Sequence, residues 1–234
     1  MGWHPIDPDV VEDSNLNRLV GATQQDVVRC TSKASVAGRV IVGVNARARI
    51  SIETVRWQMC AIALRSCDLI LGCVDSIAER EQLETAARRY LTPYVDVGMD
   101  VHRMAQGFSI GGQVALSMPG GPCLRCMGII DDRKLELEAQ AYGAAGGRPQ
   151  VVWPNGLLAS LAVGFLVQLF TPWRKASELP LLLEFDGDAQ TVSPSNKLLY
   201  LEEDACSHFA DLTSLGDPLW GTEGLRKRKA TAKS

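Results

Sequence analysis

The pair Cys123-x-x-Cys126 is the first place in this sequence where residue type and spacing could do chemistry. Two cysteines at this spacing can be half of a zinc site, a redox pair, or two unrelated thiols. A thioredoxin-type redox motif opens a helix after a strand, whereas Pro119, two glycines and Pro122 predict a tight loop here. A structural zinc site needs four ligands, so this pair alone leaves the choice open.

A second set of candidates is polar and charged. Segment 6–18 carries Asp7, Asn15 and Arg18, Lys33 follows 15 residues later, and Asp75 ends an apolar run. Taken singly, each has an ordinary explanation as a solvated charge or a helix cap. Taken together, their order resembles the ThiF/MoeB/HesA family, which includes ubiquitin-activating enzymes and carries an acidic strand end followed by Ser-Asn-Leu-x-Arg.

The resemblance extends over most of the chain, from about residue 6 to 208. Several further pieces fall in the family's order, and as a set they are specific: Arg80, Tyr94-Val-Asp-Val-Gly98, Gly111-Gly-Gln-Val, Pro122-Cys-Leu-Arg-Cys126 and the apolar helix after Asn155. The resemblance implies adenylation of the C-terminal carboxylate of a ubiquitin-like protein or a peptide, with release of pyrophosphate. It also implies ATP and Mg²⁺ as cofactors.

The site residues follow from the same resemblance. Arg18 and Lys33 match the family's phosphate contacts, Asp75 its magnesium position, Asp7 its ribose contact, and Asn15 a nucleotide-side polar contact. These residue types suit the reaction, because a carboxylate that attacks the α-phosphate of ATP meets crowded negative charge. Asp75 also ends a predicted parallel strand, which is where ligands of α/β proteins bind.

The resemblance also bears on the cysteine pair. Many family members complete a zinc site with a second Cys-x-x-Cys near the C-terminus, and this chain has Cys206-Ser-His208 in that place. Cysteine and histidine are both competent zinc ligands. We therefore expect a structural zinc bound by Cys123, Cys126, Cys206 and His208.

Two features of the family pattern are missing. Family members begin this domain with a strand, a Gly-x-Gly-Gly-x-Gly loop and a helix, and here the chain starts almost at the acidic strand end. Members that form an enzyme thioester often carry its cysteine in a segment that corresponds to 127–150, which has none. We expect Cys30, Cys60, Cys67 and Cys73 to be structural, in helices or strands, and hence no enzyme thioester.

The elements that must position these residues alternate between helices and short apolar runs. This predicts an α/β fold with a Rossmann-like, largely parallel sheet and antiparallel strands at its far side, lacking the N-terminal strand-loop-helix. We expect a helix over 23–42, a buried central strand over 68–74, a surface loop over 127–150 and a hairpin turn at Asp186-Gly-Asp. One domain over 1–225 and a basic tail over 226–234 are predicted.

Composition limits the function classes. Hydrophobic residues make up 46% and charged residues 22%, so the chain should fold. The formal charge is −3, so the protein as a whole lacks the basic field expected of a nucleic-acid binder. The longest apolar run, Leu157 to Phe170, is too short to span a bilayer, and no secretory signal is recognised. Seven scattered cysteines favour reduced thiols in the cytoplasm.

Two readings of function remain, an adenylyltransferase or a catalytically weak binding subunit that docks on a partner chain. The open sheet edge left by the missing unit favours a homodimer or heteromer. A nicotinamide-dependent enzyme is disfavoured because the dinucleotide fingerprint is absent.

Overall fold

The computed structural model describes residues 2–141, 151–173, 179–201 and 206–209. The chain divides into two compact units, Met1–Ala63 with Gln150–Val152 and Leu64–Pro149 with Trp153–Ser234. Each unit is described by itself below. The expected single domain over 1–225 stays a prediction, and the basic tail lies outside the described residues.

The first unit is built on a small parallel pairing. Strand β1 (Gly2–Trp3) pairs with β2 (Arg49–Ile50), and a parallel bridge between Ile6 and Glu53 continues it. The first unit also contains two α-helices and one complete 3₁₀ helix: α1 (Gln24–Val28), α2 (Lys33–Val44) and η1 (Asp13–Asn15). A second 3₁₀ helix, η2 (Trp57–Ser66), begins in this unit and ends in the next.

The helix expected over 23–42 is wrong as one element, because the chain breaks between α1 and α2. Cys30 has a positive φ of 50°, and the Ser32 side chain accepts a hydrogen bond from the Ser35 N–H to cap a new helix. Between them, the chain pairs with the N-terminal segment, where the Val11 N–H bonds the Thr31 carbonyl. This backbone pairing replaces continuous helix and places Lys33 at the start of α2.

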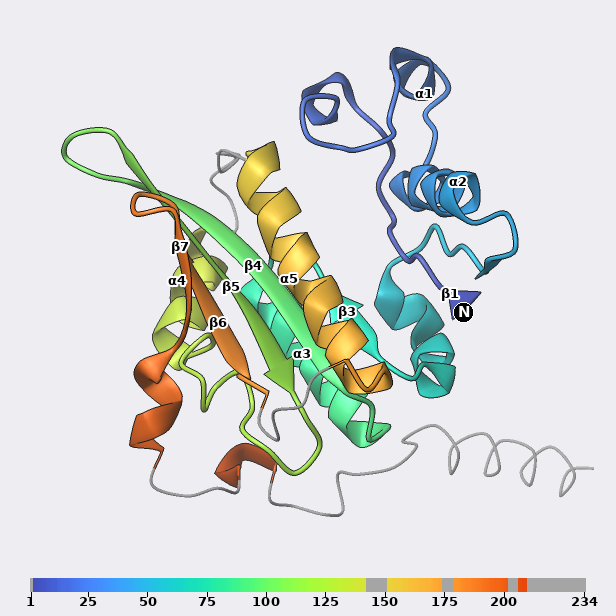
Figure 1. Cartoon of the computed structure of the whole chain (residues 1–234). Coiled ribbons are helices and arrows are strands. Elements are labelled where there is room, and N and C mark those ends of the chain that lie inside the picture. Colours follow the sequence, from blue (N-terminus) through green and yellow to red (C-terminus); the bar gives the residue numbers. More distant parts are fainter. Residues whose placement is uncertain (1, 142–150, 174–178, 202–205, 210–234) are drawn as a thin grey trace, which may run out of the picture. The chain divides into compact units, whose positions relative to one another are not determined.

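The second unit contains a five-stranded sheet in the order β3-β4-β5-β6-β7 (Figure 1). Its strands are β3 (Ile70–Gly72), β4 (Tyr94–Arg103), β5 (Phe108–Ser117), β6 (Leu182–Asp186) and β7 (Thr191–Pro194). β3 and β4 are parallel, and the three remaining pairs are antiparallel. The mixed α/β fold class is confirmed, with more antiparallel pairing in the described sheet than we expected.

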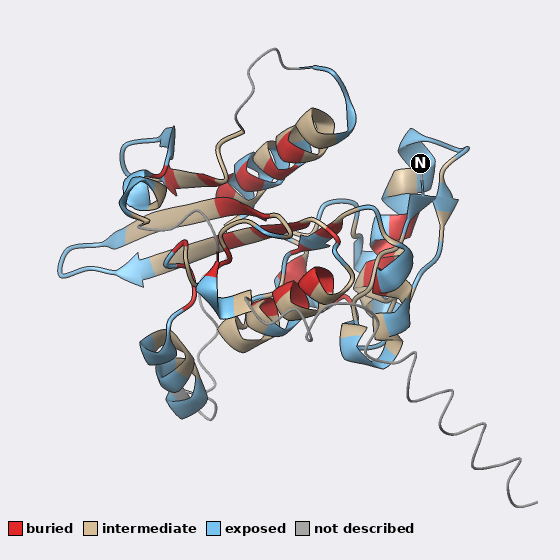
Figure 2. Ribbon diagram, turned by 90° about the horizontal axis from the view of Figure 1, so that it is seen from below, coloured by how far each residue is buried: buried red, intermediate tan, exposed pale blue. Residues whose placement is uncertain are grey.

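Helices cover both faces of this sheet. On one face, α5 (Val152–Phe170) packs its Leu158 and Phe165 into a core with Val95, Val114 and neighbouring strand residues. Side chains of alternate strand positions point the other way, and there they meet α3 (Ile77–Arg89), as the buried contact between Arg88 of α3 and Ser117 of β5 shows. Figure 2 shows buried residues along these packed surfaces, whereas the tip of the β4–β5 hairpin is exposed.

Strand β3 differs from the buried central strand that its apolar run predicted. It is the edge strand of the described sheet, and Leu71 is 44% exposed while Ile70 and Gly72 are buried. A glycine is needed at position 72, since a Cβ there would lie 2.1 Å from the Tyr94 hydroxyl oxygen. The run is therefore a strand, as predicted, but only one of its faces is covered.

The surface loop expected over 127–150 is wrong for its first half, which forms helix α4 (Asp132–Ala141). The weak apolar periodicity of this segment was the reason for expecting a loop. The helix is nevertheless capped at its start, where the Asp131 carboxylate accepts a hydrogen bond from the Lys134 N–H at 2.8 Å. Residues 142–150 lie outside the described part. Two short 3₁₀ helices, η3 (Asn196–Tyr200) and η4 (Ser207–Phe209), follow the sheet.

Two other expectations concern the C-terminal half. The hairpin turn at Asp186 is confirmed: its carboxylate accepts hydrogen bonds from the Asp188 and Ala189 N–H groups, both at 2.9 Å. The apolar run that we expected to be too short to span a bilayer belongs to a longer helix, α5, which by length and composition alone is apolar enough to cross one, so that expectation is wrong. Its buried face, however, carries Leu158, Ala162 and Phe165 into the core against the strands, so in this fold it serves as a core helix.

A bidentate salt bridge between Asp26 and Arg39 stabilises the first unit, and its strength depends on the charge of the Asp26 carboxylate. Asp26 accepts hydrogen bonds from both terminal nitrogens of Arg39, at 2.8 Å each, and from the Thr23 hydroxyl and N–H. These bonds, those of Arg39 first, hold the pKa of Asp26 well below its ordinary value of 3.8. A carboxyl whose pKa is lowered on folding stabilises the folded state fully at pH values above its unfolded pKa, here 3.8. This contribution is lost as the pH falls from there through the lower pKa of the folded state.

We therefore expect Asp26→Asn to lower the unfolding temperature at pH 7, by an amount that shrinks as pH is lowered toward 3. Thermal unfolding followed by circular dichroism at several pH values measures this. Asp13→Asn, at an exposed carboxylate of the same unit, should change little at any pH. A pH-independent loss for Asp26→Asn would contradict the prediction.

Candidate metal centre and nucleotide-site residues

Four potential metal ligands meet in the second unit. Cys123, Cys126, Cys206 and His208 each offer one ligand atom, and these four atoms lie within 4.8 Å of one another. The Sγ atom of Cys126 is 3.6 Å from the sulfurs of Cys123 and Cys206. The His208 Nδ1 atom lies 3.5, 3.4 and 3.8 Å from the sulfurs of Cys123, Cys126 and Cys206.

These distances fit a tetrahedral zinc site. Zn–S and Zn–N bonds of ~2.3 and ~2.05 Å at tetrahedral angles place sulfurs ~3.8 Å apart and sulfur and nitrogen ~3.6 Å apart. A disulfide would require the sulfurs to be ~2.05 Å apart, and all of these cysteines are free. The arrangement therefore favours a metal site over a redox pair, and a bound Zn²⁺ would tie two segments together.

The local backbone prepares this geometry. Gly120 has a positive φ of 85° in the turn after β5, which a glycine adopts without strain. The chain then folds back on itself, so that the Cys126 N–H points at the Cys123 sulfur, 3.5 Å away. Burial raises the pKa of the Cys123 thiol, and a divalent cation is what would stabilise its thiolate there.

Asp75 lies in the same unit and is exposed, but it does not end the strand as predicted: β3 stops at Gly72, and Asp75 follows three residues later in a bend. The residues on both sides of it are held in place. The Arg80 Nε donates to the carbonyl of Val74 at 3.0 Å, and Arg80 also pairs with the buried Asp96. Burial raises the pKa of Asp96, and the Arg80 charge opposes this.

On its other side, the start of α3 is bound by a carboxylate from α4. Glu138 accepts hydrogen bonds from the N–H groups of Ile77 and Ala78, both at 2.9 Å, and from the Ser76 hydroxyl at 3.1 Å. A carboxylate is stabilised at a helix N-terminus by these free donors and by the helix dipole. Asp75 is thus presented to solvent from a fixed backbone.

The remaining candidates lie in the first unit. Asp7 follows the Ile6 bridge, and its carboxylate accepts a hydrogen bond from the Asp9 N–H at 2.8 Å. Asn15 is 7% exposed and acts as a cap, since its Oδ1 accepts a bond from the Glu12 N–H at 3.1 Å. The helix-cap explanation of Asn15 therefore holds in this structure, and a nucleotide contact stays a prediction.

The two predicted phosphate contacts, Arg18 and Lys33, also lie in the first unit. The Arg18 guanidinium donates to the Ser14 carbonyl and to the Asn17 side chain. Lys33 begins α2, and its Nζ pairs with Asp9 at 2.7 Å. This pair is solvent-accessible, and such pairs contribute little to stability, so the lysine can exchange Asp9 for another anion.

The structure thus brings the four metal ligands together in one unit. It places Asp7, Asn15, Arg18 and Lys33 in the first unit and Asp75 in the second. Sequence reasoning missed Glu138 and the pairing of Asp9 with Lys33. Glu138 gave no local signal, because its partners lie about 60 residues away in the chain.

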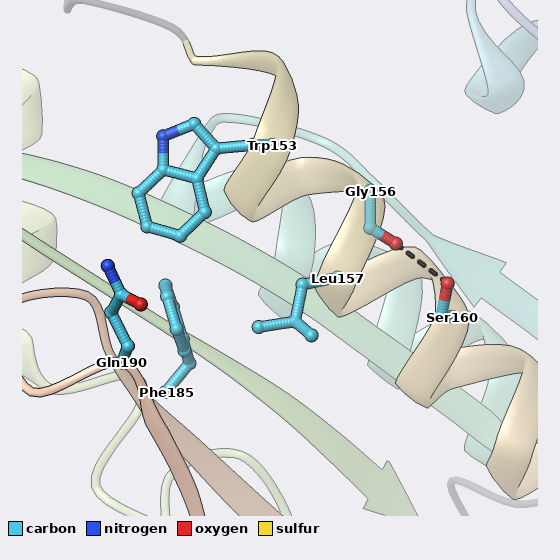
Figure 3. A pocket seen from close by; sticks show the side chains of 6 residues that line it. All are labelled: Trp153, Gly156, Leu157, Ser160, Phe185 and Gln190. Carbon is cyan, nitrogen blue, oxygen red and sulfur yellow. Dashed lines mark hydrogen bonds between the residues drawn. The ribbon is translucent and has the colours of Figure 1, made fainter.

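A hollow of about 480 Å³ lies elsewhere in the second unit, between α5 and the β6–β7 hairpin. Figure 3 shows Trp153 and Leu157 on the helix side and Phe185 and Gln190 on the hairpin side. The six lining residues carry no charge: Trp153, Gly156, Leu157, Ser160, Phe185 and Gln190. The described lining therefore offers no charged side chain to a phosphate.

Comparison with known proteins identifies the family. The ThiF family model matches residues 5–203. The chain belongs to the ThiF family. Over 184 residues it is 28% identical to sulfur carrier protein ThiS adenylyltransferase of Escherichia coli K12, covering 77% of this chain and 66% of that protein.

Solved structures support the same fold. The structure of E. coli MccB with ATP matches with a TM-score of 0.65 and 18% identity, over 84% of this chain and 56% of MccB. PaaA matches with a TM-score of 0.59 and 17% identity, over 80% and 62%. This ThiF-family chain therefore spans about two thirds or less of the length of these relatives.

The free cysteines outside the metal cluster differ partly from expectation. Cys30 and Cys73 are exposed and Cys60 and Cys67 are partly exposed. Only Cys60 lies in a helix, η2, so the expectation that all four are buried in helices or strands is wrong. Burial, aided by a nearby carboxylate, raises the pKa of the Cys60 and Cys67 thiols, which makes them poor nucleophiles at neutral pH. The absence of an enzyme thioester in this ThiF-family chain stays a prediction.

The metal cluster predicts a stoichiometry. We expect the purified protein to carry about one zinc per chain by elemental analysis, and Cys206→Ser to lower that content strongly, since structural zinc needs all four ligands. Cys30→Ser, at an exposed cysteine outside the cluster, should leave the zinc content unchanged. Metal-free wild-type protein, or full zinc in the Cys206→Ser variant, would refute the site.

The Glu138 contact predicts an effect on stability. Removing it leaves the first N–H groups of α3 without their carboxylate, at a cost of about 1 kcal/mol. Urea unfolding of Glu138→Ala should show this loss. Glu136→Ala makes the same change at an exposed position of the same helix and should be close to neutral; equal effects of both variants would contradict the assignment.

Proposed function

We propose that this chain is an ATP-dependent adenylyltransferase that activates the C-terminal carboxylate of a ubiquitin-like protein or peptide. The observation that carries the proposal is Asp75: it is exposed, it follows the carboxyl end of β3 by three residues, its neighbours are fixed by Arg80 and Glu138, and it lies within the ThiF match. A carboxylate in this position suits Mg²⁺, which prefers oxygen ligands.

In this proposal the first unit binds the nucleotide. Arg18 and Lys33 contact its phosphates, and a phosphate replaces Asp9 as the partner of Lys33. Asp7 accepts hydrogen bonds from the ribose hydroxyls, and Asn15 supports the nucleotide side. Asp75 would hold the Mg²⁺, which together with the two cations would offset the charge that accumulates on the phosphates.

The reaction is a nucleotidyl transfer. An oxygen of the substrate carboxylate attacks the α-phosphorus of ATP, the bond from that phosphorus to the β-phosphate bridging oxygen breaks, and pyrophosphate leaves. The product is an acyl-adenylate. It is handed directly to a sulfur-transfer reaction or to a partner, and no enzyme thioester forms. Zinc at Cys123, Cys126, Cys206 and His208 has a structural role, and the protein works in the cytoplasm.

The relatives support the substrate class. One is named for the sulfur carrier protein ThiS, and structures of MccB contain ATP or MccA. A carrier protein or a peptide is therefore the substrate to test first.

One observation favours the alternative, a binding subunit that docks on a partner chain. β3 is the edge of the described sheet, and within the described residues no glycine-rich loop joins a strand to a helix. An open strand edge can pair with another chain. In this alternative the chain is itself catalytically weak or inactive, and it docks on a partner chain in a homodimer or heteromer.

ATP–pyrophosphate exchange tests the proposal, with a ThiS-type sulfur carrier protein as the substrate. We expect exchange that depends on the carrier and falls at least ~100-fold in Arg18→Ala and Asp75→Asn, because each removes charge stabilisation from the transition state. Asp68→Asn changes an exposed acid before the same strand and should retain wild-type exchange.

The other outcomes are equally informative. Carrier binding without exchange supports the binding subunit. Exchange that is unaffected by both substitutions would refute the proposed site, and neither binding nor exchange with carrier proteins or peptides would refute the substrate class.

A further inference from the structure

The buried pair of Glu84 and Arg88 on α3 is not used by the proposed chemistry. These side chains are 1% and 3% exposed, and the Arg88 Nε lies 3.4 Å from the Glu84 Oε1. Removing two charges from water is costly, and a buried ion pair seldom yields net stability over apolar residues of the same size. The other hydrogen-bond partners of the two side chains indicate a different role.

Both side chains form hydrogen bonds with the backbone on the two sides of Cys123. Arg88 donates to the carbonyls of Gly121 and Pro122, at 3.1 and 2.8 Å. Glu84 accepts a hydrogen bond from the Leu124 N–H, at 3.0 Å to Oε1. The residue before Cys123 and the residue after it are therefore both bound to the same ion pair.

Ser117 locks the pair to the end of β5. Its hydroxyl donates to Glu84 at 2.5 Å and accepts from the Arg88 terminal nitrogen at 2.7 Å. Ser117 is 1% exposed. The orientation of both charged side chains is thus set by the sheet, and they cannot turn without breaking buried hydrogen bonds.

The metal ligands lie in two ligand segments, one with Cys123 and Cys126 and the other with Cys206 and His208. Arg88 also contacts the second of these segments. Its guanidinium carbon lies 4.7 Å from the centre of the Phe209 ring, a cation–π distance. Phe209 directly follows His208 in η4. One arginine therefore contacts both segments that carry metal ligands, which are about 80 residues apart in the chain.

We infer that Glu84 and Arg88 are positioning residues of the Cys3His centre: they hold both ligand segments at the spacing that a tetrahedral zinc requires. The inference rests on the proposed zinc site. Outer contacts that orient metal ligands commonly affect metal affinity 10- to 100-fold, because they fix the ligands before the metal arrives. The ligand segments should accordingly be close to their final arrangement without metal.

Zinc release from the full-length, zinc-loaded protein tests this. We expect Arg88→Met to release zinc to a chromogenic chelator ~10- to 100-fold faster than wild type. Arg88→Lys keeps the charge but loses the planar fork that serves several acceptors, so it should rescue only in part. Glu84→Gln keeps the shape and supplies a second variant if Arg88→Met fails to fold.

Leu83→Ala is the matched control. Leu83 is a buried residue of the same helix, so its truncation lowers global stability without touching either ligand segment's hydrogen bonds to the ion pair. Its zinc release should stay within twofold of wild type while the protein is folded. The absorption spectrum of Co²⁺-substituted protein supplies a second readout, which should change for Arg88→Met and not for Leu83→Ala.

The outcomes separate the two claims. Zinc-free wild-type protein would refute the zinc site itself. A zinc-loaded wild type whose Arg88→Met and Glu84→Gln variants release zinc at the wild-type rate would overturn the positioning role. Equal acceleration by Leu83→Ala would overturn it too, because the effect would then follow from global stability.

Discussion

The buried contact between α3 and the turn after β5 is the constraint on which the second unit depends. Glu84 and Arg88 of α3 bond Ser117 at the end of β5 and the backbone around Cys123. Their charges are almost without water, so each hydrogen bond is costly to lose. Helix, sheet and metal-ligand segment are therefore fixed relative to one another by a single polar cluster.

The same helix connects this cluster to Asp75. α3 begins next to Asp75, where Glu138 binds its first N–H groups and Arg80 binds the Val74 carbonyl. It ends near the cluster of Arg88. A rigid helix about 20 Å long, at 1.5 Å per residue, thus joins the proposed magnesium ligand to the support of the metal centre.

The predictions from sequence succeeded where a local pattern decides. The apolar run to Phe170 formed a helix, and Asp186 formed its turn, because periodicity and side-chain-to-backbone bonds act over a few residues. They failed where distant segments compete. Pairing with the N-terminal segment broke the helix expected over 23–42, and Glu138 bound α3 from α4, within a segment expected to be a loop.

The sequence by itself determined the family and the identity of the candidate ligands, because residue type and order along the chain are local information. The tertiary structure alone decided that Cys123, Cys126, Cys206 and His208 meet at zinc-like distances, and that Glu84 and Arg88, an ordinary helical i, i+4 pair, are buried beside them. Those facts depend on contacts between segments far apart in the chain, which folding around a shared core brings together.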